Sequence, residues 1–349
     1  MKDTVLPHTM SVTIHDSIAT IPSKEWDDLV DHMMCCTSAW MNLFEHSLPR
    51  HVTPYYVTVL HNDHLIGGAV CYKTKRKFWN IRIPVVAIMC LFSEEKIFIK
   101  EGEDYTLVLS HLHEGIEEIA KKEKVFMISV PYLSHETALK FFKEKGYTLI
   151  RGALLTRLNI EWETFEDYLR SLSRKAKKSI RHTINQGRRR GLVLEHSHDF
   201  SDADNLFNLY RANLERHNYE HTIPFSSELF QNFERYVKDQ VYILRCFCEG
   251  DLLGYWIYFF DGNCANMVLS AIDYTYPREY DAYFNICYDA VREMIEKRCR
   301  FIDFGATTYE VKGRIGCTMK ETMTAVRVMN PLFRKGVQLV AFLWNKRLE

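Results

Sequence analysis

A short segment near the C-terminus gathers side chains suited to proton transfer and to the stabilisation of negative charge. An expected strand at residues 301–304 ends at Gly305, and Tyr309, Glu310 and Lys312 follow within a few residues. Loops after strand ends are where open α/β sheets place their ligands. A lysine at such a place can direct a compact positive charge at a developing oxyanion.

Three further side chains extend this candidate site. Proton transfer needs a base close to the reacting group, and Asp273, His217 and Glu310 carry side chains suited to accept a proton. Tyr309 and Tyr283 are the candidate proton donors. An aspartate is also typical of a turn, most histidines are not catalytic, and tyrosines more often serve in packing. The sequence alone does not rank these candidates.

The most unusual charge pattern is a basic run at residues 170–190, which contains nine Lys or Arg residues and no Asp or Glu. Like charges crowded on one helix repel each other, so we interpret the run as a surface for an anionic partner. The phosphates of tRNA and an acidic acyl-carrier protein both have the required charge. A solvated helix face is the alternative interpretation.

Length and composition limit the class of protein. At roughly 100–200 residues per domain, 349 residues indicate two domains. Hydrophobic residues make up 47% of the chain and charged residues 26%, which is typical of a folded protein and excludes a disordered or fibrous chain. The 45 Lys and Arg residues balance the 45 Asp and Glu residues, which excludes a globally basic nucleic-acid-binding protein.

The ten cysteines include no C-x-x-C pair, and no Cys/His cluster has the spacing of a zinc site. We therefore expect free thiols in a reducing cytoplasm and no metal. The N-terminus has no apolar signal core. The longest apolar stretch, residues 83–92, is far shorter than the roughly 20 residues of a membrane span. These features predict a soluble cytoplasmic protein without a membrane span.

The elements that must position these residues alternate between strands and helices. In the first half we expect strands at 11–15, 55–60, 65–72, 81–91, 125–130 and 147–158, and helices near 24–30, 38–46, 105–122 and 135–145. In the second half we expect helices at 164–186, 203–217, 226–238, 283–297 and 333–348, and strands at 193–196, 241–249, 252–260, 265–272, 301–304 and 322–329.

The two halves repeat each other. LIGG at 65–68 has a counterpart in LLGY at 252–255, and GIEEIAKKEKVFMISV at 115–130 aligns with AVREMIEKRCRFIDFG at 290–305. Both halves share the order helix, helix, hairpin, strand, helix, strand. Several matches at a nearly constant separation indicate an internal duplication.

The order hairpin, helix, strand resembles the GNAT acyltransferase fold, present here twice. ALKFFKEKGY at 138–147 looks like the closing helix of a GNAT domain, and FIDFGATTYEVKGRIGC at 301–317 resembles the same point of the FemABX-like tandem-GNAT family. LRSLSRKAKKSIRHTINQGRRRGL at 169–192 is similar to that family's basic helix. The resemblance implies an α/β fold of two GNAT-like domains, each a mixed β-sheet flanked by helices. We expect the domains at 1–160 and 161–349, with the active site and a C-terminal helix in the second.

The resemblance also implies an activity, which is the transfer of an acyl or aminoacyl group to an amine, such as an amine of a peptide. The expected donor is a thioester, either acyl-CoA or the phosphopantetheine-bound group of an acyl-carrier protein. The alternative donor is an aminoacyl-tRNA. The alternative function is that of a non-catalytic module that binds a peptide or a cell-wall fragment. Lys312 lies where this family places a lysine after an Asp-x-Gly strand and an aromatic residue, which implies that it stabilises the oxyanion. We expect Lys312 to be mobile and little buried, so that its removal leaves folding nearly intact.

The chain departs from GNAT enzymes where they bind the pyrophosphate of coenzyme A. Those enzymes use a glycine-rich loop at a helix N-terminus, whereas residues 273–281 contain no glycine. The coiled-coil arm of some FemABX enzymes is also missing. The donors that remain are an acyl chain on phosphopantetheine, bound without the phosphate loop, and an aminoacyl-tRNA. The residues expected to bind the donor are Arg174, Lys178, Arg181, Arg188, Arg189, Arg190 and Tyr283.

Overall fold

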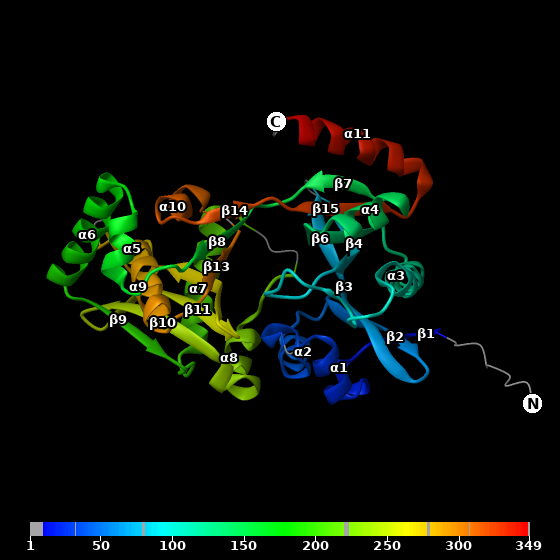
Figure 1. The fold of residues 1–349 in the computed structure, drawn as a ribbon, viewed down its shortest axis with the longest axis horizontal. Coiled ribbons are helices and arrows are strands. Elements are labelled where there is room, and N and C mark those ends of the chain that lie inside the picture. Colours follow the sequence, from blue (N-terminus) through cyan, green and yellow to red (C-terminus); the bar gives the residue numbers. More distant parts are fainter. Residues whose placement is uncertain are drawn as a thin grey trace, which may run out of the picture. The chain divides into compact units, whose positions relative to one another are not determined.

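The computed structural model describes residues 10–31, 33–78, 81–219, 223–277, 280–306 and 308–347. The chain divides into two compact units (Figure 1). Unit 1 consists of Met1–Gly152, Thr222–Pro224 and Thr322–Glu349, and unit 2 of Ala153–His221 and Phe225–Glu321. Each unit contains one mixed β-sheet with its own hydrophobic core.

Unit 1 is built on an eight-stranded sheet in the order β1-β2-β3-β4-β6-β15-β7, with β5 paired to β3. Its strands are β1 (Met10–His15), β2 (Thr53–His61), β3 (His64–Phe78), β4 (Ile81–Ile88), β5 (Ile97–Ile99), β6 (Met127–Leu133), β7 (Thr148–Arg151) and β15 (Met323–Val328). Its helices are α1 (Ser23–Leu29), α2 (Ser38–Glu45), α3 (Tyr105–Lys122), α4 (Glu136–Glu144) and α11 (Pro331–Arg347).

Unit 2 is built on a seven-stranded sheet in the order β14-β8-β13-β12-β11-β10-β9. Its strands are β8 (Leu155–Asn159), β9 (Leu192–Ser197), β10 (Val241–Cys248), β11 (Asp251–Asp261), β12 (Cys264–Ile272), β13 (Phe301–Gly305) and β14 (Thr318–Lys320). Its helices are α5 (Phe165–Ser171), α6 (Arg174–Arg189), α7 (Ala203–His217), α8 (Ser227–Tyr236), α9 (Ala282–Glu296) and α10 (Tyr309–Arg314).

The expected duplication is visible in the central hairpins. Both β2–β3 and β10–β11 turn through two residues with positive φ, at Asn62 and Asp63 in one and at Glu249 and Gly250 in the other. This backbone matches the twist of antiparallel strands. Each hairpin then has a register shift at the same distance from its turn, between Val59/Leu60 and between Cys246/Phe247. The two hairpins are therefore equivalent in register, as predicted.

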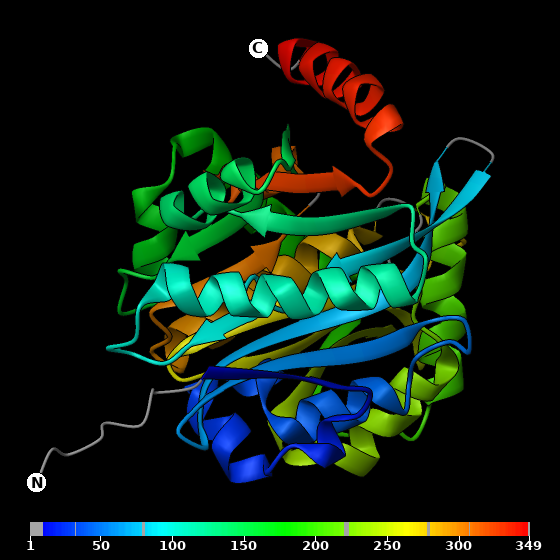
Figure 2. The same cartoon turned by 90° about the vertical axis from the view of Figure 1, so that its right-hand side faces the viewer.

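Helices cover both faces of each sheet. Adjacent residues of a central strand contact helices on opposite faces. A Cβ on Gly67 would meet Val108 of α3, whereas a Cβ on Gly68 would meet Trp26 of α1. Successive side chains of a strand point to opposite faces, so α3 and α1 lie on opposite sides of the first sheet (Figure 2).

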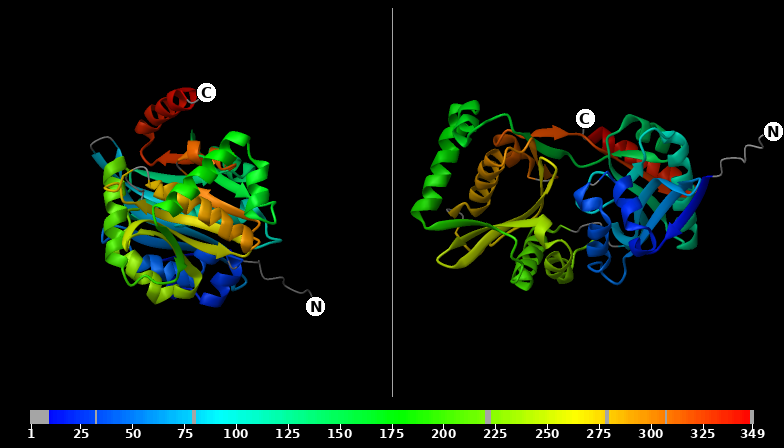
Figure 3. Two further views of the ribbon diagram at one scale, coloured as in Figure 1. Left: turned by 90° about the vertical axis from the view of Figure 1, so that its left-hand side faces the viewer. Right: turned by 60° about the horizontal axis from the view of Figure 1, so that its bottom comes forward.

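The second sheet repeats this arrangement. A Cβ on Gly254 would meet Ile286 of α9, and the next residue, Tyr255, donates its hydroxyl hydrogen to the carbonyl of Leu206 in α7 at 2.9 Å. Helices α9 and α7 therefore lie on opposite faces (Figure 3). Both units have the mixed sheet flanked by helices that the sequence predicts.

Each sheet incorporates one strand from the other half of the chain. In unit 1, β15 from the C-terminal region lies between β6 and β7 and pairs antiparallel with both. In unit 2, β8 from the first half lies between β13 and β14 in the same way. The division at residue 160 therefore differs from the structure, because β8 belongs to unit 2 and both β15 and α11 belong to unit 1. Strand propensity does not reveal which sheet a strand will join.

Three local expectations need correction. The single helix expected at 164–186 is two helices, α5 and α6, because Ser173 interrupts it and accepts the N–H of Ala176 as a helix cap. The strand expected at 147–158 is divided into β7 and β8, which join different sheets. The aligned helix–strand segments are one residue out of register, because Lys124 and Arg298 both take positive φ at the same point after their helices.

No helix within the described residues combines the length and the apolar character needed to cross a membrane.

The exchanged strand β15 leads to a test by truncation. Ending the chain after Glu321 removes the buried residues Ala325, Val326 and Val328 and leaves β6 and β7 without a common neighbour. We expect unit 1 to lose about 4 kcal/mol or more of unfolding free energy, since each buried valine contributes about 2 kcal/mol. Thermal unfolding measures this loss. Ending the chain after Asn330 keeps β15 and is the control; equal melting temperatures for the two truncated chains would contradict the structural role of β15.

Candidate active site

The candidate site begins where two parallel strands of unit 2 stop pairing. The parallel register of β12 and β13 covers three pairs, from Cys264 with Phe301 to Asn266 with Asp303. Beyond them β12 continues to Ile272 and β13 to Gly305. Backbone carbonyls at the end of β13 therefore need donors from outside this ladder, because buried carbonyls are rarely left unpaired.

Lys312 supplies these donors. It lies on α10 and is 2% exposed, and its Nζ donates to the carbonyls of Phe304 at 2.6 Å and Ala306 at 2.9 Å. The carbonyl of Gly305 is further away, at 3.5 Å, and it already accepts the hydroxyl hydrogen of Thr156 at 2.6 Å. The ammonium group thus holds the end of β13 in place through two strong bonds and one weak contact.

The expectation that Lys312 is mobile and little buried is wrong. Its side chain lies within unit 2, and burial is the main reason that its pKa falls from 10.5 to about 8, although Cys317, Cys287 and Asp303 act in the opposite direction. The tight turn of α10 after β13 directs the side chain back to the strand end. Sequence reasoning placed the lysine beside the strand but did not show that the backbone itself would bind it.

Tyr283 of α9 lies beside the end of β13. Its hydroxyl lies 3.1 Å from Oγ1 of Thr308, the residue that precedes α10, and its ring stacks on Trp256 at 5.8 Å. Trp256 also contacts the ring of Phe304 at 5.3 Å. Burial, followed by the neighbouring Cys287 thiol, raises the pKa of Tyr283, so its hydroxyl keeps its proton.

Sequence reasoning did not identify three residues that surround Tyr283, namely Thr308, Trp256 and Cys287. Thr308 directly precedes the helix that carries Lys312, and a threonine in that place is a signal for a helix start. Trp256 follows the repeated LLGY segment by one residue. No sequence signal distinguishes Cys287 from the other buried cysteines, and burial raises the pKa of its thiol to about 12.

Tyr309 and Glu310 open α10 but differ in their environment. Tyr309 is half-buried, and no contact in the described part of the chain assigns it a role. The side chain of Glu310 is 82% exposed and pairs with Arg314 at 2.6 Å on the helix surface. The structure thus places the Glu310 carboxylate in a surface ion pair.

Asp273 and His217 lie together near the loop after β12. The Asp273 carboxylate accepts the backbone N–H and the hydroxyl of Thr275 at 2.8 and 2.6 Å, which is a turn geometry. His217 Nε2 lies 3.0 Å from the hydroxyl of Tyr274, the residue after Asp273. The hydrogen bond to Tyr274 thus places His217 beside the loop that follows β12.

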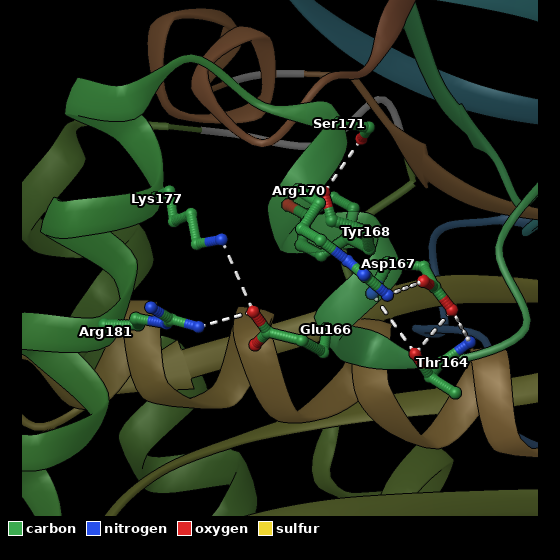
Figure 4. A network of polar contacts seen from close by, with 8 residues as sticks. All are labelled: Thr164, Glu166, Asp167, Tyr168, Arg170, Ser171, Lys177 and Arg181. Atoms are coloured by element: carbon green, nitrogen blue, oxygen red, sulfur yellow. Dashed lines mark hydrogen bonds and ion pairs between the residues drawn. The ribbon is translucent and has the colours of Figure 1, made fainter.

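The basic run forms two surfaces. Arg170 lies on α5 and pairs with Asp167, while Lys177 and Arg181 of α6 both contact Glu166, Lys177 at 3.4 Å (Figure 4). These acidic partners lie just before the run, so part of its charge is neutralised. The remaining exposed cations on α6 are Arg174, Lys175, Lys178, Arg188 and Arg189. Five cations share one face of the helix because of their spacing: Arg174, Lys178, Arg181, Arg188 and Arg189.

Helix α6 lies against the start of α9, which is where GNAT enzymes bind phosphate. A Cβ on Gly187 would approach Asn285 Oδ1 to 2.8 Å, so α6 needs a glycine there to pack this closely. The guanidinium of Arg190 lies 5.6 Å from the ring centre of Tyr280. Asp281 occupies the N-cap position of α9, where its charge opposes a phosphate, and burial raises its pKa. Together with the lack of glycine, this carboxylate makes a poor fit for the pyrophosphate of coenzyme A.

Residues 278 and 279 of the glycine-free segment 273–281 lie outside the described residues. Within the described chain, no group of three or more His, Cys, Asp or Glu side chains is arranged to hold a metal ion.

Solved structures with the same fold cover 93–95% of the chain. FemX matches with a TM-score of 0.62 at 14% identity, covering 95% of this chain and 100% of FemX. A tandem GNAT protein from the clavulanic acid biosynthesis pathway matches with a TM-score of 0.59 at 12% identity, covering 93% and 99%. The C-terminal domain of a putative lysylphosphatidylglycerol synthetase from Agrobacterium fabrum matches with a TM-score of 0.57 at 13% identity, covering 95% and 96%.

These likenesses confirm the tandem-GNAT fold. No curated protein matches the sequence. A model of the FemAB-like family, described by peptidoglycan biosynthesis/recognition, matches residues 89–347. That match includes β5, α3, β6, α4 and β7 of unit 1, all of unit 2, and the exchanged strand β15 with α11. The chain belongs to the FemAB-like family of peptidoglycan biosynthesis and recognition proteins, with the fold of a tandem GNAT transferase.

Proposed function

We propose that the protein is an N-acyltransferase that moves an acyl group from a carrier-bound thioester to an amine of a peptide. The observation that carries the proposal is the ammonium group of Lys312, held at the separated ends of β12 and β13 in unit 2. The family's association with peptidoglycan supports a peptide as the acceptor. In the reaction the amine nitrogen bonds to the acyl carbon, the carbon–sulfur bond breaks, and the thiolate takes up a proton.

The hydrogen bonds of Lys312 leave one of its protons available for this reaction. Two protons are engaged by Phe304 and Ala306, whereas the third has only the contact with Gly305 at 3.5 Å. Because Thr156 already satisfies Gly305, turning this third proton towards a substrate leaves no backbone carbonyl unpaired. Lys312 can therefore donate to the oxyanion of the tetrahedral intermediate while it still holds the strand end.

The attacking amine must lose a proton, and the leaving sulfur must gain one. His217 is the base that we favour, because its Nε2 bonds to the hydroxyl of Tyr274 in the loop that follows β12, one of the two strands that separate at the site. Burial raises the pKa of Tyr283, which supports its hydroxyl as the donor of that proton. Asp273 is the second candidate base, although its carboxylate is occupied by Thr275 in the structure.

The carrier is inferred from the charged side chains around the N-terminus of α9. The start of this helix fits the pyrophosphate of coenzyme A poorly, whereas α6 beside it carries an exposed row of cations. An acyl-carrier protein presents acidic side chains to such a row. The donor group then comes from a macromolecule bound through α6.

An aminoacyl-tRNA is the second candidate donor, and the same row of cations favours it because phosphates bind arginine strongly. Incubation with acyl-CoA, acyl-carrier protein or charged tRNA, followed by mass spectrometry of an amine-bearing peptide, separates the donors. Modification with acyl-CoA alone would overturn the macromolecular donor. No modification with any donor would leave the alternative that the protein binds a peptide or cell-wall fragment without catalysis.

Removal of Lys312 tests its two roles. Lys312→Met should lower the turnover number by about 100- to 1,000-fold, the usual effect of losing one oxyanion donor. Contrary to the expectation from sequence, it should also destabilise the fold, because the carbonyls of Phe304 and Ala306 lose their donor; we expect about 2–4 kcal/mol. Turnover within tenfold of the wild-type value in a folded variant would exclude the catalytic role.

The lowered pKa of Lys312 predicts a dependence of stability on pH. Between about pH 8 and 10.5 the unfolded chain keeps the Lys312 proton and the folded chain loses it, so stability rises with pH. Lys312→Met should reduce this rise by up to about 1.4 kcal/mol per pH unit. Denaturant unfolding of both proteins at several pH values measures the difference. Parallel stability curves across this range would show that the folded-state pKa is close to 10.5.

Charge reversal on α6 tests the carrier-binding surface. Arg188→Glu with Arg189→Glu should raise the KM for the macromolecular donor by tenfold or more and weaken its salt dependence, with little change in kcat. Lys140→Glu with Lys143→Glu on α4 is the matched control, since both lysines are exposed and the change in charge is the same. If the α6 variant keeps the wild-type KM at low salt, the cations form only a solvated helix face.

A further inference from the structure

The hairpin β3–β4 in unit 1 extends beyond the sheet to which it belongs. Strand β2 pairs with β3 only as far as Lys73, and β6 pairs with β4 only from Val85 onwards. Beyond these pairs, β3 and β4 pair with each other from Lys75 with Pro84 to Phe78 with Ile81. This part is therefore a two-stranded ribbon that projects from the sheet, visible at the upper right in Figure 2.

This ribbon carries a concentrated positive charge and an exposed isoleucine. Residues 64–93 contain no Asp or Glu, and five Lys or Arg residues lie between 73 and 82. Lys75, Arg76, Lys77 and Arg82 are exposed. Ile81, the first described residue of β4, is 68% exposed. An exposed isoleucine among arginines and lysines contributes nothing to the core of unit 1.

Helix α11 combines the same two properties. Leu332, Phe333 and Leu339 are 86%, 56% and 60% exposed. The segment 331–348 contains four Lys or Arg residues and no Asp or Glu. Its other side is attached to unit 1, since the Asn345 side chain bonds to the backbone of β7 at both Arg151 (2.9 Å) and Leu149 (3.1 Å).

The ribbon and α11 are neighbours on unit 1. The N–H of Phe126 donates to the carbonyl of Pro84 at the base of the ribbon at 2.8 Å, and the ring of Phe126 lies 6.0 Å from that of Phe333 in the first turn of α11. Figures 2 and 3 show the ribbon extending towards the side of the unit on which α11 lies. The two cationic and apolar features therefore form one surface, which we call the ribbon–α11 surface.

We propose that the ribbon–α11 surface binds an anionic lipid bilayer, with its cations at the headgroups and its exposed apolar side chains among the upper acyl chains. Basic residues beside a membrane are attracted to anionic lipids, and exposed leucine, isoleucine and phenylalanine side chains gain free energy from burial at the interface. RNA would account for the cations but not for the exposed leucines of α11.

The test uses the full-length protein and sedimentation with vesicles of phosphatidylcholine, with or without phosphatidylglycerol. We expect binding to the vesicles that contain phosphatidylglycerol and weak binding to phosphatidylcholine alone. Lys75→Glu with Lys77→Glu should lower the partition coefficient by at least about 30-fold, since the loss of each basic residue alone costs about a fivefold factor. Leu332→Gln with Leu339→Gln should lower it by about tenfold without loss of fold, because both side chains are already exposed.

The matched control is Arg188→Glu with Arg189→Glu on α6, which changes the charge equally in unit 2. If it reduces vesicle binding as much as the ribbon variant, the attraction depends on charge alone and the ribbon–α11 surface is not the site. Equal binding of all variants, or no sedimentation with phosphatidylglycerol vesicles, would also overturn the proposal. Retention of tRNA on a filter that depends on Lys75 and Lys77, without vesicle binding, would assign the ribbon to nucleic acid instead. Transfer assays with water-soluble donors and acceptors keep a failure of membrane binding distinct from a failure of catalysis.

Discussion

The exchange of one strand between the two halves of the chain completes both sheets and shapes the candidate site. A sheet position beside β6 or β13 must be filled, because an open edge there would leave two rows of backbone groups unpaired. In unit 1 it is filled by β15 and in unit 2 by β8. The candidate site depends on this exchange directly, since Thr156 of β8 satisfies the carbonyl of Gly305 and so relieves Lys312 of one acceptor.

A second constraint is the early end of parallel pairing in both sheets. The strands β4 and β6 share three registered pairs, as do β12 and β13. In each unit a buried lysine binds a backbone carbonyl of the second strand of this parallel pair, which is β6 in unit 1 and β13 in unit 2. Lys96 bonds to the carbonyl of Tyr132 in β6 at 2.9 Å, and Lys312 to that of Phe304 in β13 at 2.6 Å. Lys96 precedes β6 in the sequence, whereas Lys312 follows β13. The two halves therefore supply a donor to these carbonyls from different positions in the sequence.

The distribution of charge is the third feature, because a chain with no net charge has concentrated its cations at separate places. One is α6, beside the helix start where phosphate groups bind in GNAT enzymes, and another is the ribbon of β3 and β4. Folding gives the two places different surroundings. On α6 the apolar residues are turned inwards, whereas on the ribbon Ile81 remains exposed. This difference supports a macromolecular donor at one and a lipid surface at the other.

The sequence alone determined the element types, the duplication, the two-residue turns and the family, because hydrophobic periodicity and turn residues act over a few positions. It also brought Lys312 next to the end of β13 and identified the basic helix. Only the tertiary structure decided which sheet receives β8 and β15, since any strand with apolar residues on one face can complete either sheet. It also decided that Lys312 is buried and that Glu166 neutralises part of the basic run. These outcomes depend on contacts between residues that are far apart in the chain or on opposite sides of a turn, and no local pattern records them.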